Sequence, residues 1–329
     1  MRAIVRQKAA KNLSGMKVME LDVPRMGPQQ LTIKMASARI NPVDIDLMKG
    51  MPFLKYKKPQ IGGIDGAGTI LDMGSEVNGF QIGDEVFFYR AFTDIGTWAE
   101  QIVIDAQYVA SIPQSLNLIQ AGGIALPLLT AYESLIQMEP KRGESILIHA
   151  GAGGVGYQAT QIALGMGLKV IATASDQDFG LLRGLGVEAL IDYRSQDFSQ
   201  ILANQPPNYI FDLVGGEVLA KSISLQPKRL VSVNYPDVSK LHKTGIKIPS
   251  LLRGIMRLAT SKYLRMAKRH SVELIGQVTG GNGKLLREAT DFINRLPQYQ
   301  IRESHTANLD FVEREGMQGL RHGTVLLFG

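Results

Sequence analysis

A glycine-rich turn between an apolar strand and a helix constrains this chain more than any other feature of its sequence. Ile146, Leu147 and Ile148 form the short apolar run typical of a buried parallel strand, and glycines at 151, 153 and 156 follow with G-x-G-x-x-G spacing. A helix beginning near residue 155 and a second apolar strand over residues 170–173 complete a β-α-β unit. Such a unit holds a pyrophosphate at the positive end of its helix, so we predict a dinucleotide site here.

The end of the second strand carries a further prediction about the nucleotide. A carboxylate at this point would accept hydrogen bonds from the ribose hydroxyls of NAD, whereas this strand ends Thr173-Ala174-Ser175. These small side chains leave room for a 2′-phosphate. The sequence therefore favours NADPH over NADH.

Length and composition limit the class of protein. A chain of 329 residues, 45% of them hydrophobic, can fill the cores of two domains. No apolar run reaches the roughly 18 residues of a membrane span, and the first residues lack the apolar core of a signal peptide. We expect a soluble protein of the cytoplasm.

The sequence also limits the chemistry. Cysteine is absent, which removes disulfides, thiolate metal sites and cysteine nucleophiles. The five histidines form no H-E-x-x-H or other clustered ligand pattern, so each of them, including His149 beside the glycine turn, is predicted to be structural or solvent-facing. We expect no metal site.

The pattern along the chain predicts two kinds of domain. Residues 1–123 carry short strand patterns separated by Gly, Pro, Asn and Asp, as in a compact barrel-like β domain. Its predicted strands span residues 3–6, 31–38, 68–73, 85–89 and 98–104. From residue 124 helices and strands alternate, which predicts an α/β fold with a doubly wound parallel sheet. Its strands after the glycine turn are predicted at residues 170–173, 189–191, 209–213, 229–234 and 272–275. A final apolar strand ending at Phe328 can return to the first domain.

The net charge of +6 comes from one segment. Residues 240–270 contain nine Lys or Arg and no Asp or Glu, and the rest of the chain is mildly acidic. Within this segment residues 250–270 are predicted to form a basic amphipathic helix. A solvated face, or a wall over the phosphate end of an anionic cofactor, is favoured over a nucleic-acid or membrane site, because the only aromatic residue in this helix is Tyr263.

Several motifs in chain order resemble the zinc-independent medium-chain dehydrogenase/reductases, the quinone oxidoreductase-like enzymes. They are Asn41-Pro42-Val43-Asp44, Gly63-Ile64-Asp65-Gly66-Ala67-Gly68, Gly83-Asp84-Glu85-Val86, Ala125-Leu126-Pro127-Leu128-Leu129-Thr130-Ala131, the glycine turn and Phe211-Asp212-Leu213-Val214-Gly215-Gly216. The resemblance implies a GroES-like β-barrel catalytic domain over residues 1–123 and 284–329, and a Rossmann domain over residues 124–283. It also implies NADPH and a homodimer.

The resemblance assigns the cofactor contacts residue by residue. The residues implied to bind NADPH are Thr130, Ala152, Gly153, Gly154, Val155, Gly156, Ser175, Tyr193, Val214, Gly215 and Asn234. Ser175 and Tyr193 would face the 2′-phosphate, and Thr130 the nicotinamide carboxamide. Relatives often carry a lysine where this chain has Asp178. A carboxylate there repels a phosphate, so Arg183, Arg194 or the basic helix would have to supply the positive charge.

Zinc-containing relatives carry Gly-His-Glu where this chain has Gly63-Ile64-Asp65, and a cysteine ligand near the position of Asn41. The expected reaction is therefore metal-free hydride transfer from NADPH to a quinone or an α,β-unsaturated carbonyl. Asn41 and Tyr56 are the candidate catalytic polar groups, and Asp44 is predicted to be structural. The alternative is a non-catalytic NADPH-binding protein that docks on RNA or a membrane surface through residues 240–270.

Overall fold

The computed structural model describes residues 1–8, 13–50, 59–90, 96–235, 237–241, 248–302 and 304–328. The chain divides into two compact units. Unit 1 is formed mainly by Met1–Leu126 and Gly280–Gly329, and unit 2 by Pro127–His242 and Ile248–Thr279.

Unit 1 is built around an almost entirely antiparallel sheet whose spatial order is β14-β15-β3-β4-β5-β7, with β6 paired to β3. The strands are β3 (Gln30–Arg39), β4 (Asp65–Met73), β5 (Glu85–Tyr89), β6 (Gln101–Asp105), β7 (Val109–Ser111), β14 (Thr306–Asn308) and β15 (Val325–Leu327). A separate pair joins β1 (Arg2–Arg6) to β2 (Met16–Glu20). All five strands predicted for residues 1–123 are present, whereas β2, β7 and β14 of unit 1 were not predicted from the sequence.

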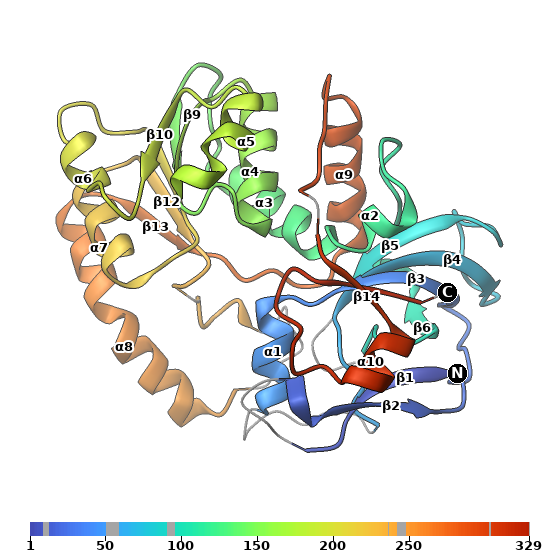
Figure 1. The fold of residues 1–329 in the computed structure, drawn as a ribbon. Coiled ribbons are helices and arrows are strands. Elements are labelled where there is room, and N and C mark those ends of the chain that lie inside the picture. Colours follow the sequence, from blue (N-terminus) through green and yellow to red (C-terminus); the bar gives the residue numbers. More distant parts are fainter. Residues whose placement is uncertain are drawn as a thin grey trace. The chain divides into compact units, whose positions relative to one another are not determined.

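The C-terminal strand returns to unit 1 as predicted. β15 pairs antiparallel with β3, and β14 pairs with β15. Figure 1 shows these red C-terminal strands beside the blue and cyan strands of the first part of the chain. The helices of unit 1 are α1 (Pro42–Lys49), α2 (Leu118–Ala121), α9 (Gly283–Asn294) and α10 (Leu309–Glu315), with short 3-10 turns η1 (Leu13–Gly15) and η2 (Ala106–Tyr108).

Unit 2 contains a parallel sheet of spatial order β10-β9-β8-β11-β12-β13. The strands are β8 (Ser145–Ile148), β9 (Lys169–Ala174), β10 (Ala189–Asp192), β11 (Tyr209–Asp212), β12 (Arg229–Ser232) and β13 (Glu273–Gly276). All six predicted strands of this domain are confirmed. Numbered from β8, the order is 3-2-1-4-5-6, which is the order of a doubly wound dinucleotide-binding domain.

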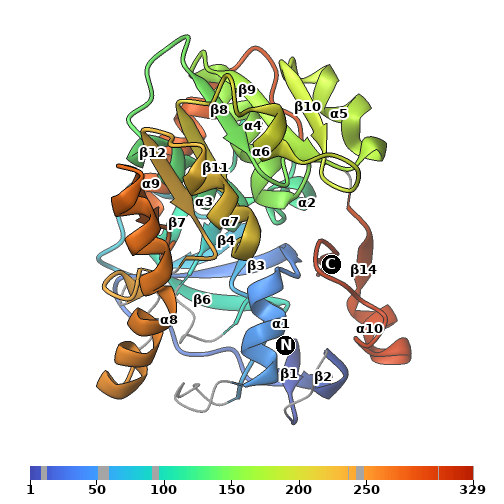
Figure 2. The same cartoon turned by 90° about the vertical axis from the view of Figure 1, so that its left-hand side faces the viewer.

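Helices cover both faces of the unit 2 sheet. They are α3 (Ala125–Gln137), α4 (Gly154–Gly165), α5 (Phe179–Gly184), α6 (Phe198–Ile201), α7 (Gly216–Ser224) and α8 (Ser250–Arg269), with the 3-10 turn η3 (Asp176–Asp178). α4 and α5 lie on one face, and α6, α7 and α8 lie on the other, which faces the viewer in Figure 2. Because parallel strands end at the same edge, their following loops gather at one side of the sheet.

None of the described helices is both long enough and apolar enough to cross a membrane.

Candidate nucleotide-binding site

The glycine turn after β8 is shaped by backbone crowding. A Cβ atom on Gly156 would lie 2.1 Å from the carbonyl oxygen of Ala150, and one on Gly151 would lie 2.7 Å from the Cβ of Ala172 in β9. Ala150 itself has a positive φ of 51°. Only glycine therefore fits at 151 and 156, as the motif predicts.

Gly153 has a different environment from these two glycines. It is exposed and stands at the N-cap of α4, where it has no side chain to cap the helix. Free N–H groups and the positive end of a 12-residue helix are therefore available to an anion. Gly154, exposed, and Val155, half-buried, follow in the first turn, and Ala152 is buried before it. This arrangement fits the pyrophosphate of a dinucleotide.

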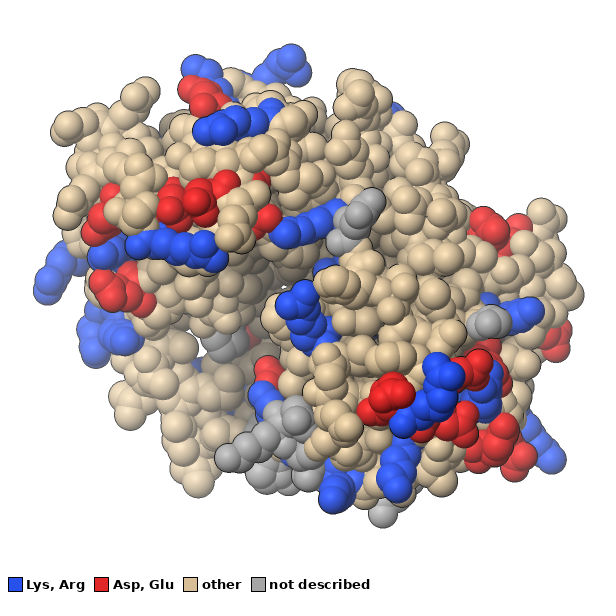
Figure 3. All heavy atoms as spheres, in the orientation of Figure 1, with Lys and Arg blue, Asp and Glu red and all other residues tan. Residues whose placement is uncertain are grey.

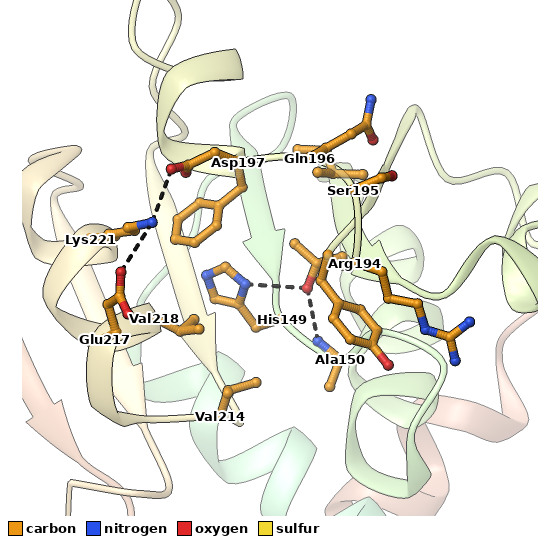
Figure 4. A pocket seen from close by; sticks show the side chains of 14 residues that line it. His149, Ala150, Arg194, Ser195, Gln196, Asp197, Val214, Glu217, Val218 and Lys221 are labelled. Atoms are coloured by element: carbon orange, nitrogen blue, oxygen red, sulfur yellow. Dashed lines mark hydrogen bonds and ion pairs between the residues drawn. The ribbon is translucent and has the colours of Figure 1, made fainter.

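A cavity of about 520 Å³ opens beside the turn, within unit 2. Figure 4 shows the His149 ring lying between α7 and the loop that carries Arg194. The cavity is lined by His149, Ala150, Thr173, Ile191, Tyr193, Arg194, Ser195, Gln196, Asp197, Phe198, Val214, Glu217, Val218 and Lys221. Lys221 of α7 joins this helix to the loop before α6, because its Nζ lies 2.9 Å from Asp197 Oδ2. The same Nζ lies 3.2 Å from Oε1 of Glu217, which is also in α7.

His149 forms part of the cavity floor as a neutral ring. Its Nε2 lies 2.9 Å from the hydroxyl of Ser222 and its Nδ1 3.3 Å from that of Thr173. Its ring packs edge-on against Phe198 at a centroid distance of 4.5 Å. Burial lowers the pKa of His149 to about 4, although the nearby Asp212 carboxylate acts in the opposite direction. His149 was predicted to be structural or solvent-facing, and these buried contacts agree with the structural role.

Ser175, a predicted 2′-phosphate contact, is hydrogen-bonded to Asp178, the residue that stands where relatives often carry a lysine. Its hydroxyl donates to Asp178 Oδ2 at 2.9 Å, and its side chain does not line the cavity. Tyr193 does line it and is 61% exposed. The guanidinium of Arg194 stacks over the Tyr193 ring at 5.7 Å and lies 3.7 Å from Asp176.

Arg183, Arg194 and the basic helix were the predicted sources of positive charge for the 2′-phosphate, and the structure places the two arginines differently. Arg194 lines the cavity beside Tyr193. Arg183 stacks over Phe179 in α5 and is not part of the lining. Of this pair, only Arg194 lines the cavity.

The loops after β11 and β12 bring three other predicted residues together. Gly215 has a φ of 78°, and a Cβ on it would lie 2.6 Å from the Cβ of Asn234. The Asn234 amide donates to the carbonyl of Leu213 at 2.9 Å. Val214, 51% exposed, forms the edge of the cavity.

Asp212 organises these loops and was missed as a site residue. Its Oδ1 accepts the backbone N–H groups of Val214 and Gly215 at 3.0 and 2.9 Å, and its Oδ2 accepts the Ser232 hydroxyl at 2.6 Å. A carboxylate at the end of an apolar strand, three residues before Gly215-Gly216, was the available signal. Thr130 lies in α3, 7% exposed, and does not line the cavity.

The predicted catalytic residues belong to unit 1, where Asn41 is part of a buried network. Asn41 is the N-cap of α1 and is 2% exposed, and its side-chain amide donates to Asp65 Oδ1 at 2.8 Å. Its backbone N–H donates to Asp44 Oδ2 at 2.7 Å, so Asp44 has the structural role predicted for it. Tyr56 lies outside the described residues.

Asp65 is the residue that stands in the Gly63-Ile64-Asp65 motif. Its Oδ2 accepts the backbone N–H of Leu126 at 3.2 Å, and the residue is fully buried. Burial raises the pKa of Asp65 to about 7 despite these donors and the nearby Arg39. Burial, together with the Asp65 carboxyl, also raises the pKa of Asp44 well above its usual range. Among the described residues no group of three or more His, Cys, Asp or Glu side chains could hold a metal.

The fold and the glycine turn together define a class: a protein with a doubly wound dinucleotide-binding domain joined to a second, mainly antiparallel unit. The profile of the Alcohol dehydrogenase GroES-like domain matches residues 27–114, in unit 1.

Comparisons with known proteins narrow this class. The chain is 31% identical over 255 residues to the Homo sapiens protein Quinone oxidoreductase, covering 77% of this chain and 73% of that protein. It is 33% identical over 220 residues to the Arabidopsis thaliana chloroplastic NADPH-dependent alkenal/one oxidoreductase, covering 61% and 55%. The solved structure of the quinone oxidoreductase from Coxiella burnetii matches with a TM-score of 0.79 and 28% identity over 99% of each chain.

This chain therefore belongs to the quinone oxidoreductase-like medium-chain dehydrogenase/reductases. The expected α/β fold, with its GroES-like and Rossmann parts, is confirmed. The chain spans a smaller share of several other relatives than of the human protein. For five further curated relatives at 30 to 38% identity, the chain spans 54 to 63% of their length.

Proposed function

We propose that this protein is an NADPH-dependent oxidoreductase that transfers a hydride to a quinone or an α,β-unsaturated carbonyl without a metal. The observation that carries the proposal is the glycine turn, closed to any Cβ at residues 151 and 156, beside a cavity of about 520 Å³ at the ends of parallel strands. The names of the Arabidopsis and human relatives support this reaction class. These names do not favour a non-catalytic role.

Each part of the site has a proposed task. The backbone from Ala152 to Gly156 would hold the pyrophosphate, and the cavity would hold the adenosine half of the cofactor. Val214, Gly215, Asn234 and Thr130 would lie along the nicotinamide half. The bound cofactor supplies the hydride, and the protein positions it against an electron-poor carbon.

Arg194 is proposed to replace the lysine of relatives in selecting NADPH. Asp178 engages the hydroxyl of Ser175 and adds negative charge, which opposes binding of a 2′-phosphate. Arg194 can offset that charge, because a guanidinium binds phosphate through paired N–H donors. Its stacking on Tyr193 holds it at the cavity.

The substrate is proposed to need only hydrogen-bond donors. Reduction of a quinone or enone develops charge on an oxygen, which donors stabilise without a metal or a nucleophile. Asn41 and Tyr56 remain the proposed polar groups of unit 1. For Asn41, the hydrogen bonds to Asp44 and Asp65 support a role in positioning α1. We propose the catalytic domain to be residues 1–123 and 284–329, and the Rossmann domain to be residues 124–283, acting as a homodimer.

The test is a titration of the protein with NADPH and with NADH, followed by nicotinamide fluorescence. We expect tighter binding of NADPH, and about a tenfold loss of NADPH affinity in Arg194→Ala with little change for NADH. Arg183→Ala is the matched control, since Arg183 does not line the cavity. Asp178→Asn should tighten NADPH binding. Tighter binding of NADH than of NADPH, or no binding of either nucleotide, would refute the proposal.

A further inference from the structure

α8 presents large apolar side chains to solvent. Leu251 is 80% exposed, Leu258 76% and Ile255 55%. Their spacing of i, i+4 and i+7 places all three on one face of the helix. The sequence predicted a basic amphipathic helix here, and the structure leaves these three apolar side chains in solvent.

The C-terminal half of α8 holds the helix to unit 2. Ala267 is buried, and Tyr263 and Met266 pack against the same core cluster as α7 and β12. The Tyr263 ring also meets Tyr235 edge-on at 6.3 Å. The N-terminal turns extend beyond α7 and the sheet in both ribbon views (Figures 1 and 2). The exposed apolar face is therefore at the projecting end of a firmly attached helix.

The same helix is strongly basic. It carries Arg253, Arg257, Lys262, Arg265, Lys268 and Arg269 and no acidic residue. No ion pair joins these six to a carboxylate within the part of the chain that the structure describes. On the face shown in Figure 3, the N-terminal turns of α8 are largely uncharged, and basic side chains lie toward its other end.

We propose that α8 docks on the surface of an anionic phospholipid bilayer. Leu251, Ile255 and Leu258 would enter the boundary between headgroups and acyl chains, while the flanking arginines and lysines meet the lipid phosphates. The helix lies in the plane of the interface, since six cations within 20 residues prevent it from spanning the bilayer.

Charge and shape favour this surface over other occupants. Two copies of α8 packed on each other would bring like charges together, and those charges repel, so the homodimer proposed above would form through another surface. A nucleic acid would leave the leucines exposed to water, and single strands bind largely through stacking aromatic side chains. The only aromatic ring in α8, that of Tyr263, is already packed against Tyr235.

The test is co-sedimentation of the full chain with phosphatidylcholine vesicles that contain no, or about 30 mol%, phosphatidylglycerol. We expect binding to the anionic vesicles only, and loss of most of it between about 50 and 500 mM salt. The double variant Leu251→Gln/Leu258→Gln should bind at least about tenfold more weakly. Arg253→Gln/Arg257→Gln should lose about fivefold per charge at low salt.

Ile82→Gln is the matched control, because Ile82 is 65% exposed but lies in unit 1. Its vesicle binding should equal that of the unsubstituted protein, and all variants should keep the NADPH affinity. Equal loss in this control, equal binding to neutral vesicles, or unchanged binding of the leucine variant would overturn the proposal. The proposal would also be overturned if Leu251→Gln/Leu258→Gln kept its vesicle binding but lost self-association or binding to RNA, because the apolar face would then bind a second copy or a nucleic acid.

Discussion

The two units each bury a polar cluster beside the end of a strand, and the clusters differ in the groups that they contact. In unit 2, His149 joins Thr173 and Ser222 at the floor of a cavity. In unit 1, Asn41 joins Asp44 and Asp65, and the two carboxyl groups accept backbone N–H groups of the chain itself. Both clusters are almost completely buried.

The difference teaches how a buried polar group is to be interpreted. Asp44 and Asp65 accept hydrogen bonds from Asn41 and from the backbone N–H of Leu126, and these bonds hold α1 and the start of α3 in place. A cluster that also lines a cavity leaves one side for a ligand. The pKa shifts of the two clusters also differ, because burial lowers the pKa of His149 and raises that of Asp65.

The largest expected effect comes from Gly156→Ala in unit 2. The new Cβ would lie 2.1 Å from a backbone oxygen, so the turn must move. We expect at least about a hundredfold loss of NADPH affinity and about 3 kcal/mol lower free energy of unfolding of unit 2. Fluorescence titration measures the affinity, and hydrogen exchange of the β8–β11 peptides measures the stability. Gly180→Ala in α5, whose Cβ would meet nothing within 4 Å, should bind NADPH normally.

The second prediction is that the two units respond oppositely to pH. The pKa of His149 falls from 6.5 to about 4 on folding, so unit 2 loses stability as pH drops through this window. The pKa of Asp65 rises from 3.8 to about 7, so unit 1 loses stability as pH rises through that window. Each effect is on the order of 3 kcal/mol.

Trp98, the single tryptophan, is buried in unit 1 and reports its urea unfolding. Asp65→Asn should flatten the pH dependence of that signal, whereas Asp72→Asn, exposed on the same strand, should not. His149→Gln should flatten the dependence seen by hydrogen exchange in unit 2. The same slope in both units would contradict the contrast between the clusters.

A smaller effect is expected from Asn41→Ala. The substitution removes the amide that donates to Asp65 Oδ1 and leaves a buried carboxyl with one partner fewer. We expect a loss of about 2 kcal/mol in the free energy of unfolding of unit 1, followed by Trp98 fluorescence, and a further rise in the pKa of Asp65. Asn78→Ala, on the surface, is the control. Normal stability with a lower kcat/KM would instead favour substrate contact by Asn41.

The sequence predicted the fold of unit 2 well because its strands are short apolar runs separated by glycines. β8 to β13 all occur where the runs indicate. In unit 1, β2, β7 and β14 were missed, because β2 is only partly buried and β7 and β14 have three residues each. A three-residue strand is too short to show the alternation that marks a half-buried strand, and β2 lacks it.

The site was less predictable than the fold. The glycine turn follows from its spacing, whereas the hydrogen bond between Ser175 and Asp178 depends on side-chain geometry that spacing does not encode. The placement of Arg194 rather than Arg183 at the cavity depends on where the loop after β10 lies. The exposure of the α8 leucines is not encoded in their helical spacing, which is the same for a buried and for an exposed apolar face.

The most direct test of the account is transfer of deuterium from NADPH deuterated at C4. The protein would be mixed with each C4-deuterated stereoisomer and a panel of enones and quinones, and the products analysed by mass spectrometry. We predict deuterium at the β-carbon of a saturated product, or matching oxidation of the nicotinamide with a quinone, from one stereoisomer only. Tight NADPH binding with no substrate-dependent oxidation and no deuterium in any product would contradict the proposed hydride transfer.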